Sequence, residues 1–177
     1  NGEKDGFLKR RGCSMPAKRL KEFLDNSGVH YVTITHSPAF TAQEIAATAH
    51  VPGKELAKTV MVKIDGQMAM VVLPGSYKID FDLLEEALGA RRVELASEQE
   101  FKDLFPECEI GAMPPFGNLY GLQTYVADSL AEEVQIIFNA GSHTELIRMN
   151  YSDYERLVEP EIVEISVKGE MGKEWFL

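Results

Sequence analysis

The stretch 58–73 constrains the fold more than any other part of the sequence. Two apolar runs rich in valine and methionine stand on either side of Asp65 and Gly66. An Asp-Gly pair between two such runs is a strong signal for a β-hairpin, because both residues tolerate the positive φ that a two-residue turn requires. The sequence therefore predicts two adjacent antiparallel strands, at 58–64 and 67–73.

Short strands and helices alternate along the rest of the chain. Runs of β-branched residues predict further strands at 29–35, 91–95, 123–127, 134–139, 144–149 and 162–167. The spacing of apolar residues and the stop signals predict helices at 17–27, 42–49, 81–88, 98–105 and 153–159. About seven short strands with interspersed helices indicate an α+β (mixed α/β) domain and argue against a doubly wound parallel sheet.

Three of these helices are expected to begin with a capping box, in which a serine or threonine and a glutamate three residues later exchange hydrogen bonds. The pairs are Thr41 with Glu44, Ser97 with Glu100, and Ser152 with Glu155. The Thr41 hydroxyl therefore already has a structural role. Polar or glycine-containing turns are predicted at 128–129 and at 139–143.

The composition is that of one globular domain with its own core. Of the 177 residues, 45% are hydrophobic and 26% are charged. We expect the domain at 15–167 and a loose tail at 168–177. Residues 1–14 lack the apolar stretch of a signal peptide and are expected to be a disordered leader or a remnant of expression. No apolar run is long enough to predict a membrane span.

Charge and cysteine content exclude further classes. A net charge of −10 does not favour extended contact with nucleic acid, so we expect no DNA partner and only local contact with an RNA. Cys13 and Cys108 are too few for a disulfide scaffold, which points to the cytoplasm. Cys108 has no predicted partner that would activate its thiol, so a nucleophilic role is not favoured.

The segment 109–118 is the candidate working surface. It contains Pro114 and Pro115 between Gly111 and Gly117. The prolines remove two backbone donors, and the glycines allow conformations closed to other residues. Such a rigid turn can bind a small ligand through its remaining backbone groups. A tight crossover between two elements of the fold explains the same residues without a ligand.

Standard catalytic and cofactor motifs are absent from the sequence. It has no phosphate-binding loop, dinucleotide fingerprint, CxxC pair or HExxH motif, and no serine in a nucleophile elbow. The four histidines do not have the spacing of metal ligands. We therefore expect no metal and no cofactor, and any chemistry must come from positioning and electrostatics.

Four short motifs, taken in order, resemble one family. They are His36-x4-Thr41, Lys58-Thr59 at the start of an apolar strand, Gly111-x3-Pro115-x-Gly117, and the late turn Asn139-Ala140-Gly141. The family is the YbaK and prolyl-tRNA synthetase-associated editing domain. The resemblance implies a curved, barrel-like mixed sheet of about seven strands with flanking helices. It also implies hydrolysis of wrongly charged aminoacyl-tRNA.

The resemblance also implies roles for individual residues. Lys58 would be the key catalytic residue, assisted by Gly111, with its ammonium on a phosphate or on the ester oxygen. Without the resemblance, Lys58 would be interpreted as a solvated strand-end lysine and His36 as a surface histidine. Met113 with Phe116 would make the rim of the loop bulky. The substrate-binding residues would be His36, Thr41, Thr59, Met113, Pro114, Pro115, Gly117, Gly141 and His143.

These roles predict a deacylase that acts in trans on tRNA carrying a small amino acid. Its partners would be the 3′ end of an aminoacyl-tRNA and an aminoacyl-tRNA synthetase, without a membrane. Two alternatives remain from the residues alone. One is a non-catalytic module that binds aminoacyl-tRNA or a synthetase, and the other is an acidic protein-interaction domain.

Overall fold

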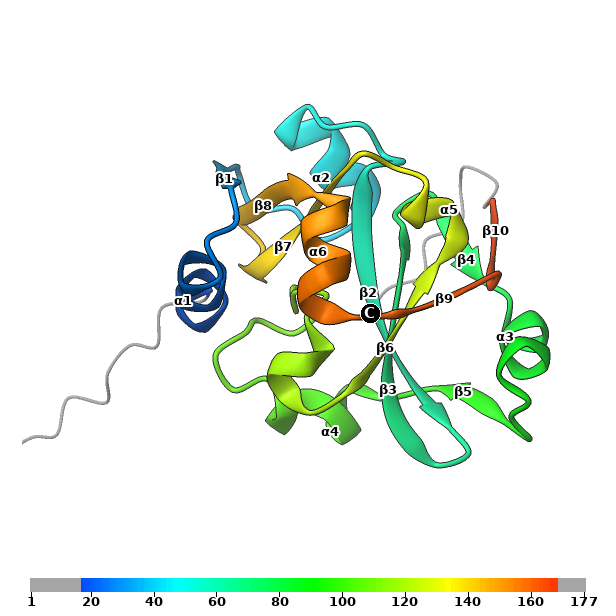
Figure 1. Cartoon of the computed structure of the whole chain (residues 1–177). Helices are drawn as coiled ribbons and strands as arrows, with labels where there is room; N and C mark the ends of the chain where they lie inside the picture. Colours follow the sequence, from blue (N-terminus) through cyan, green and yellow to red (C-terminus); the bar gives the residue numbers. More distant parts are fainter. Residues whose placement is uncertain (1–16, 169–177) are drawn as a thin grey trace, which may run out of the picture.

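The computed structural model describes residues 17–168, and an eight-stranded mixed sheet forms its frame (Figure 1). The expectations for the leader and the tail fall almost entirely outside these residues. The strand order is β1-β8-β7-β2-β3-β6-β9, and β5 pairs with β2 beside this path. The strands are β1 (Tyr31–Thr35), β2 (Leu56–Ile64), β3 (Gln67–Pro74), β5 (Val93–Leu95), β6 (Gln123–Ala127), β7 (Gln135–Ser142), β8 (Glu145–Asn150) and β9 (Glu161–Val163).

A second sheet of two strands and a set of short helices surround this frame. The second sheet pairs β4 (Tyr77–Ile79) with β10 (Ser166–Lys168). Two 3₁₀ turns lie at Lys102–Leu104 and Gly117–Tyr120. The α-helices are α1 (Lys18–Asn26), α2 (Ala42–Ala49), α3 (Phe81–Leu88), α4 (Glu98–Phe101), α5 (Asp128–Ala131) and α6 (Tyr151–Val158). No helix within 17–168 has the length and apolar character needed to cross a membrane.

The predicted hairpin is confirmed and lies in the middle of the sheet. Strands β2 and β3 are antiparallel along their whole length, and the turn residues Asp65 and Gly66 have φ values of 49° and 83°. The Asp65 carboxylate also accepts hydrogen bonds from the backbone N–H groups of Arg91 and Arg92. The turn thereby fixes the approach to β5.

The opposite edge of β2 has two different partners, and the sheet curls around it (Figure 1). Near its start β2 pairs in parallel with β7, and near its end it pairs antiparallel with β5. Parallel and antiparallel ladders therefore meet on one strand. The expectation of a curved mixed sheet in an α+β domain is confirmed.

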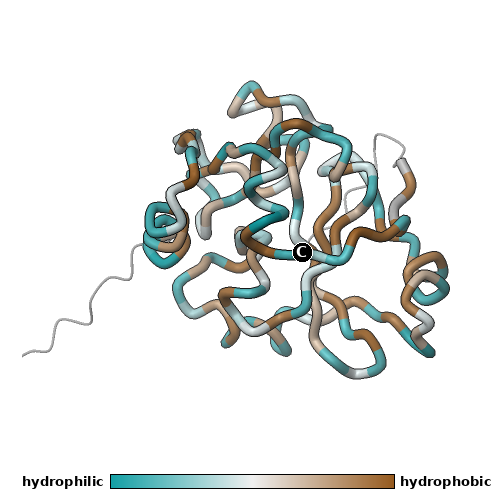
Figure 2. The backbone as a smooth tube through the Cα atoms, viewed as in Figure 1, coloured by the Kyte–Doolittle hydropathy of each residue, from teal (hydrophilic) through white to brown (hydrophobic). Residues whose placement is uncertain are grey.

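Both faces of β2 are buried, so its residues alternate between two apolar layers rather than between core and solvent. Ala57 and Met61 face the main core, whereas Val60 and Val62 face a second cluster that packs beneath α3. Hydrophobic residues accordingly follow one another along the central strands in Figure 2. This continuous burial explains the apolar run that the sequence displays.

The prediction of a glycine turn at 139–143 is wrong. Strand β7 continues to Ser142, and its pairing with β8 shifts register between Asn139 and Ser142. Gly141, with a φ of 98°, lies within this bulge. A bulge inserts an extra residue without ending the strand, and a glycine at positive φ is one way to make it. The chain reverses only after it, at His143.

Three smaller expectations also need correction, and one strand was missed. The capping box at Ser152 does not form, because α6 begins two residues earlier, with Tyr151 buried and its N–H bonded to the Val134 carbonyl. The turn at 128–129 is the start of α5. The single strand at 162–167 is two strands that belong to different sheets, and β4 was not predicted. In each case tertiary packing overrides the local signal.

Candidate functional site

Three segments that are distant in the sequence are joined by backbone hydrogen bonds. They are the turn 36–41 after β1, the first part of the proline loop at 109–112, and the bulged end of β7 with the turn that follows it, 139–144. The Ala39 N–H donates to the His143 carbonyl at 3.1 Å. The Glu109 N–H donates to the Gly141 carbonyl at 2.8 Å, and the Gly141 N–H donates to the Ala112 carbonyl at 2.9 Å. The three segments are therefore adjacent in the fold.

His143 lies where these segments meet. Its Nε2 is 2.9 Å from the Ile110 carbonyl, which can only accept, so Nε2 carries the proton. Its backbone N–H donates to the Glu109 carboxylate at 2.7 Å, and its ring lies 4.6 Å from the Phe40 ring. The buried Nδ1 atom has no hydrogen-bond partner within the described residues. In the neutral ring this nitrogen is an unused acceptor.

His36 is held in a similar way. Its Nδ1 is 2.7 Å from the Ser37 carbonyl, so this nitrogen is the donor, and its backbone N–H bonds to the Thr144 carbonyl. The buried Nε2 also lacks a partner in the part of the chain that the structure describes. Two histidines thus each present one unsatisfied nitrogen, which is uncommon for buried polar atoms.

Thr41 has the structural role that its capping box predicts. Its hydroxyl accepts the Glu44 N–H at 3.1 Å, and the Glu44 carboxylate accepts the N–H of Thr41 at 3.2 Å. The box at Ser97 and Glu100 also forms. Thr41 therefore fixes the start of α2, and its hydroxyl is already engaged before any ligand binds.

Lys58 is a half-buried cation without an acidic partner. Its Nζ is 3.4 Å from the Gly75 carbonyl, and no carboxylate within 17–168 forms an ion pair with it. Burial, and to a smaller extent the nearby positive charge of Lys78, lowers the pKa of Lys58 to about 8. In an acidic protein, an unpaired buried ammonium is a place that favours an anion.

Lys58 lies just past the short ladder between β2 and β7. Leu56 pairs with Ile137 and Ala57 pairs with Phe138, and this ladder ends there. The buried Asn139 Oδ1 has no partner among the described residues. Thr59 follows Lys58 in the strand and therefore points to the opposite face, toward the side of Met61. The structure does not bring Lys58 and Thr59 together on one face.

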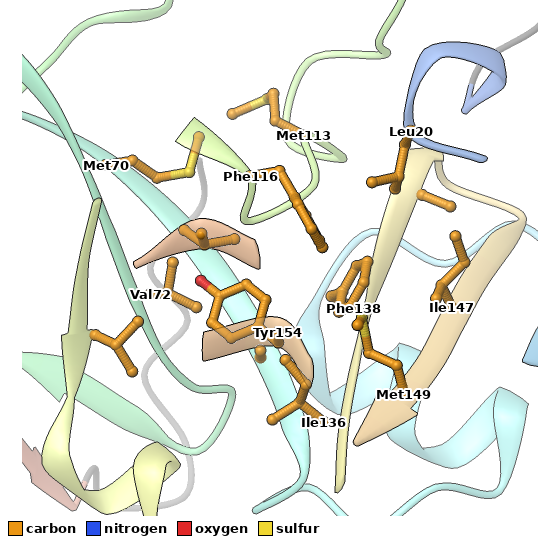
Figure 3. Packing of buried hydrophobic residues seen from close by; sticks show 14 of the residues in the cluster. Leu20, Met70, Val72, Met113, Phe116, Ile136, Phe138, Ile147, Met149 and Tyr154 are labelled. Atoms are coloured by element: carbon orange, nitrogen blue, oxygen red, sulfur yellow. The ribbon is translucent and has the colours of Figure 1, made fainter. Parts of the chain in front are cut away.

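The proline loop lies against the core rather than around a rim. Gly111 has the positive φ expected of it, 86°. Met113 and Phe116 are 3% and 0% exposed and point into the main core (Figure 3), so the expectation of a bulky rim is wrong. Phe116 packs edge-on against Phe23 and Tyr154. The Met113 and Phe116 side chains thus anchor the loop to the main core.

The second half of the loop is also used by the fold. The Pro115 carbonyl accepts the Tyr154 hydroxyl at 2.9 Å, and Pro114 is buried beside it. Gly117 is required for close approach rather than for positive φ, because a Cβ there would lie 2.8 Å from the Leu122 carbonyl. The backbone hydrogen bonds between the loop and Gly141 come from Glu109 and Ala112, and Gly111 is the loop candidate that lies between these two residues.

The residues that sequence reasoning missed are Phe40, Ile110 and Asn139. Each lies within a motif that was recognised, but only neighbouring positions were selected as site residues. The signal for Asn139 was available, since a polar residue in an apolar strand next to a bulge requires an explanation. No three His, Cys, Asp or Glu side chains within 17–168 are grouped as metal ligands.

The thiol of Cys108 is unsuited to nucleophilic chemistry. Burial raises its pKa to about 11, and its sulfur lies 3.6 Å from the Tyr120 hydroxyl. In a Cys13→Ser background, we expect native Cys108 to react with iodoacetamide at pH 7.5 about 100-fold more slowly than the unfolded chain. The rate should rise with pH up to about 11. Equal rates in native and denatured protein would contradict this assignment.

The chain matches one known class of domain along most of its length. Residues 36–157 match the family described as "Aminoacyl-tRNA editing domain", and the chain belongs to this family. The matched region contains all three segments of the site. The expectation from the sequence motifs is thereby confirmed.

Individual relatives agree with this assignment. The chain is 28% identical over 156 residues to the multifunctional Ser/Thr-tRNA deacylase ProXp-y of Escherichia coli (strain K12), covering 85% of this chain and 92% of the relative. It is 29% identical over 75 residues to the proline–tRNA ligase of Bacillus mycoides (strain KBAB4), which is 42% of this chain but 13% of that enzyme.

Two solved structures share the fold. The hypothetical protein APE2540 superposes with a TM-score of 0.76 at 21% identity and covers 85% of this chain and 100% of its own. A candidate trans-editing enzyme for prolyl tRNA synthetase superposes with a TM-score of 0.73 at 18% identity and covers 86% and 97%. The curled mixed sheet is thus the framework that these proteins have in common.

Proposed function

We propose that the protein is a trans-acting deacylase that hydrolyses the ester bond of tRNA mischarged with a small amino acid. The observation that carries the proposal is the extent of the match with the Escherichia coli deacylase. It covers 92% of that protein, whereas the match with the proline–tRNA ligase covers 13% of the enzyme. A deacylase of this kind would act on released aminoacyl-tRNA in the cytoplasm, alone or docked on a synthetase.

Lys58 supplies the positive charge in this proposal. With a pKa of about 8, its side chain is mostly protonated at pH 7, yet no carboxylate among the described residues neutralises it. An ammonium in that state would bind a phosphate near the 3′ end of the tRNA or the ester oxygen as negative charge develops. Gly75, whose carbonyl lies 3.4 Å from Nζ, would orient it.

The neighbouring polar atoms would hold the aminoacyl group. His36 Nε2, His143 Nδ1 and Asn139 Oδ1 are buried acceptors without partners within 17–168. The α-ammonium of an amino acid and the ribose hydroxyl of the terminal nucleotide are donors that such atoms can accept from. The bulge at Gly141 and the turn at Gly111 would set the distance between them.

A positioned water molecule would complete the reaction. The water attacks the ester carbonyl carbon, the bond to the ribose oxygen breaks, and the proton lost by the water passes to that departing oxygen, while the neighbouring ribose hydroxyl of the substrate orients the water. This route needs no histidine or carboxylate of the protein as a general base. Lys58 would then stabilise the oxyanion, while the loop residues would fix the orientation of the ester.

Such a second site follows from the limits of binding energy. One methylene group changes the binding free energy by only about 1–3 kcal/mol, so a synthetase pocket cannot fully reject smaller amino acids. A separate domain that admits only the small ones corrects the error. Alanine, serine, threonine and cysteine are the candidates of suitable size.

A panel of mischarged tRNAs tests the proposal. We expect the wild-type protein to deacylate at least one tRNA carrying a small amino acid, and Lys58→Ala to lower that rate at least about 100-fold. The measurement is release of labelled amino acid, with correctly charged tRNA of a large amino acid as the control. Binding without turnover across the panel would favour a non-catalytic module instead.

A further inference from the structure

Phe40 is a large aromatic side chain that the fold leaves in solvent. It is 64% exposed and is the only aromatic residue among the exposed large hydrophobic side chains of 17–168. A single exposed apolar side chain is common on a soluble protein, so exposure alone does not identify a ligand for Phe40. Its position beside the candidate site makes a ligand of that site the natural cover.

The backbone around Phe40 is held firmly. The Phe40 N–H donates to the Glu44 carboxylate at 3.0 Å, and the preceding Ala39 N–H donates to the His143 carbonyl at 3.1 Å. Thr41, on its other side, is the N-cap of α2. The ring is therefore presented by an ordered turn and has few conformations to lose when something binds to it.

One side of the ring rests on the site, and the other is open. The Phe40 and His143 rings lie 4.6 Å apart at an interplanar angle of 43°, and His143 is in turn bonded to the Ile110 carbonyl. Ile110 is itself 42% exposed. Phe40, Ile110 and His143 form a surface that we call the aromatic rim. Its outer face is apolar, and the unpartnered Nδ1 of His143 lies on its buried side.

A flat ring beside a polar atom is the combination by which proteins bind unpaired nucleobases. Stacking would also supply affinity that electrostatics does not, since a protein with a net charge of −10 gains little affinity from the phosphates of a tRNA. Base stacking on an aromatic ring does not depend on the net charge of the protein. The 3′ end of every tRNA is unpaired and terminates in adenosine, whose ribose carries the amino acid.

We infer that Phe40 is the stacking platform for the terminal adenine of the acylated tRNA. This inference rests on the proposed deacylase function and adds to it the residue that positions the nucleotide. The adenine lies on the open face of Phe40, and the esterified ribose extends toward the buried side of the aromatic rim. Phe40 is a positioning residue and does not touch the bond that is cleaved.

Steady-state deacylation kinetics test this role. We expect Phe40→Ala to raise KM by about 5–100-fold, with kcat within about threefold of wild type, and Phe40→Tyr or Phe40→Trp to restore KM. Val134→Ala is the matched control, because Val134 is an 81% exposed apolar side chain outside the aromatic rim. Thermal unfolding of Phe40→Ala should match wild type. Wild-type KM in Phe40→Ala would overturn the inference.

A binding measurement separates the inference from the proposed function. In a Trp175→Phe background, Phe40→Trp provides the single tryptophan of the chain, and adenosine 5′-monophosphate should quench its selectively excited fluorescence in a saturable manner, whereas ribose 5-phosphate should not. Failure of the wild type to deacylate any tRNA would reject the function, whereas this titration would still test the platform. Absence of quenching would reject the stacking platform. Loss of synthetase binding in Phe40→Ala at unchanged KM would also reject it and would indicate that Phe40 docks on a protein.

Discussion

Replacing Lys58 with methionine is expected to abolish deacylation and at the same time to stabilise the fold. The protonated side chain is half-buried without an acidic partner among the described residues, so the folded state bears an uncompensated charge. Methionine keeps much of the volume and removes that charge. We expect the free energy of unfolding to rise by on the order of 1 kcal/mol or more, measured by urea denaturation, while the deacylation rate falls at least about 100-fold.

The pH dependence of this stabilisation provides the control. The pKa of Lys58 is about 8 in the folded protein against 10.5 ordinarily, so the unfolded chain binds more protons between these values. The stability of the wild type should rise with pH across that window, and the advantage of Lys58→Met should be full below pH 8 and vanish near 10.5. Lys54→Met, at a side chain that is 67% exposed, should show neither effect. A destabilised Lys58→Met would contradict the assignment of an unpaired charge.

Gly117→Ala is expected to be the most damaging of the small substitutions. The added Cβ would lie 2.3 Å from the Thr124 hydroxyl and 2.8 Å from the Leu122 carbonyl. The Thr124 hydroxyl can rotate away from the added Cβ, but the Leu122 carbonyl belongs to the backbone and can move only if the chain shifts. We expect a loss of about 2–3 kcal/mol in the free energy of unfolding, or roughly 5–10 °C in the melting temperature.

Gly53→Ala is the matched control for this substitution. A Cβ at Gly53 meets no atom within 4 Å, and its φ lies outside the left-handed region. Its free energy of unfolding should change by less than about 0.5 kcal/mol. Equal melting temperatures for the two variants would mean that the chain around Gly117 can yield, and that the loop is not as rigid as its contacts imply.

Local signals predicted the parts of the fold that depend on neighbouring residues. The Asp65–Gly66 hairpin and the capping boxes at Thr41 and Ser97 each need only a few consecutive residues, and all three are confirmed. The bulge at Gly141 could not be predicted in this way. It depends on the register between two strands and on the loop residues Glu109 and Ala112, which lie about thirty positions away.

The candidate site was predicted less completely than the fold, for a related reason. Motif order selected Lys58, Gly111 and His143, but it carries no information about direction. Alternation along β2 alone could have shown that Lys58 and Thr59 point apart. The burial of Met113 and Phe116 could not be inferred, because Pro114 and Pro115 interrupt the helix or strand periodicity that would show which side chains face the core. The roles of the selected residues remain predictions until the variants are assayed.

The parallel contact between β2 and β7 has a consequence for how the domain assembles. Only Leu56 with Ile137 and Ala57 with Phe138 define this register, and the paired residues lie about eighty positions apart in the sequence. The hairpins β2–β3 and β7–β8 close over short loops and can form early, whereas joining them requires a long loop to close. A chain emerging from the ribosome therefore holds Lys58 in a finished hairpin well before β7 is available to pair with β2.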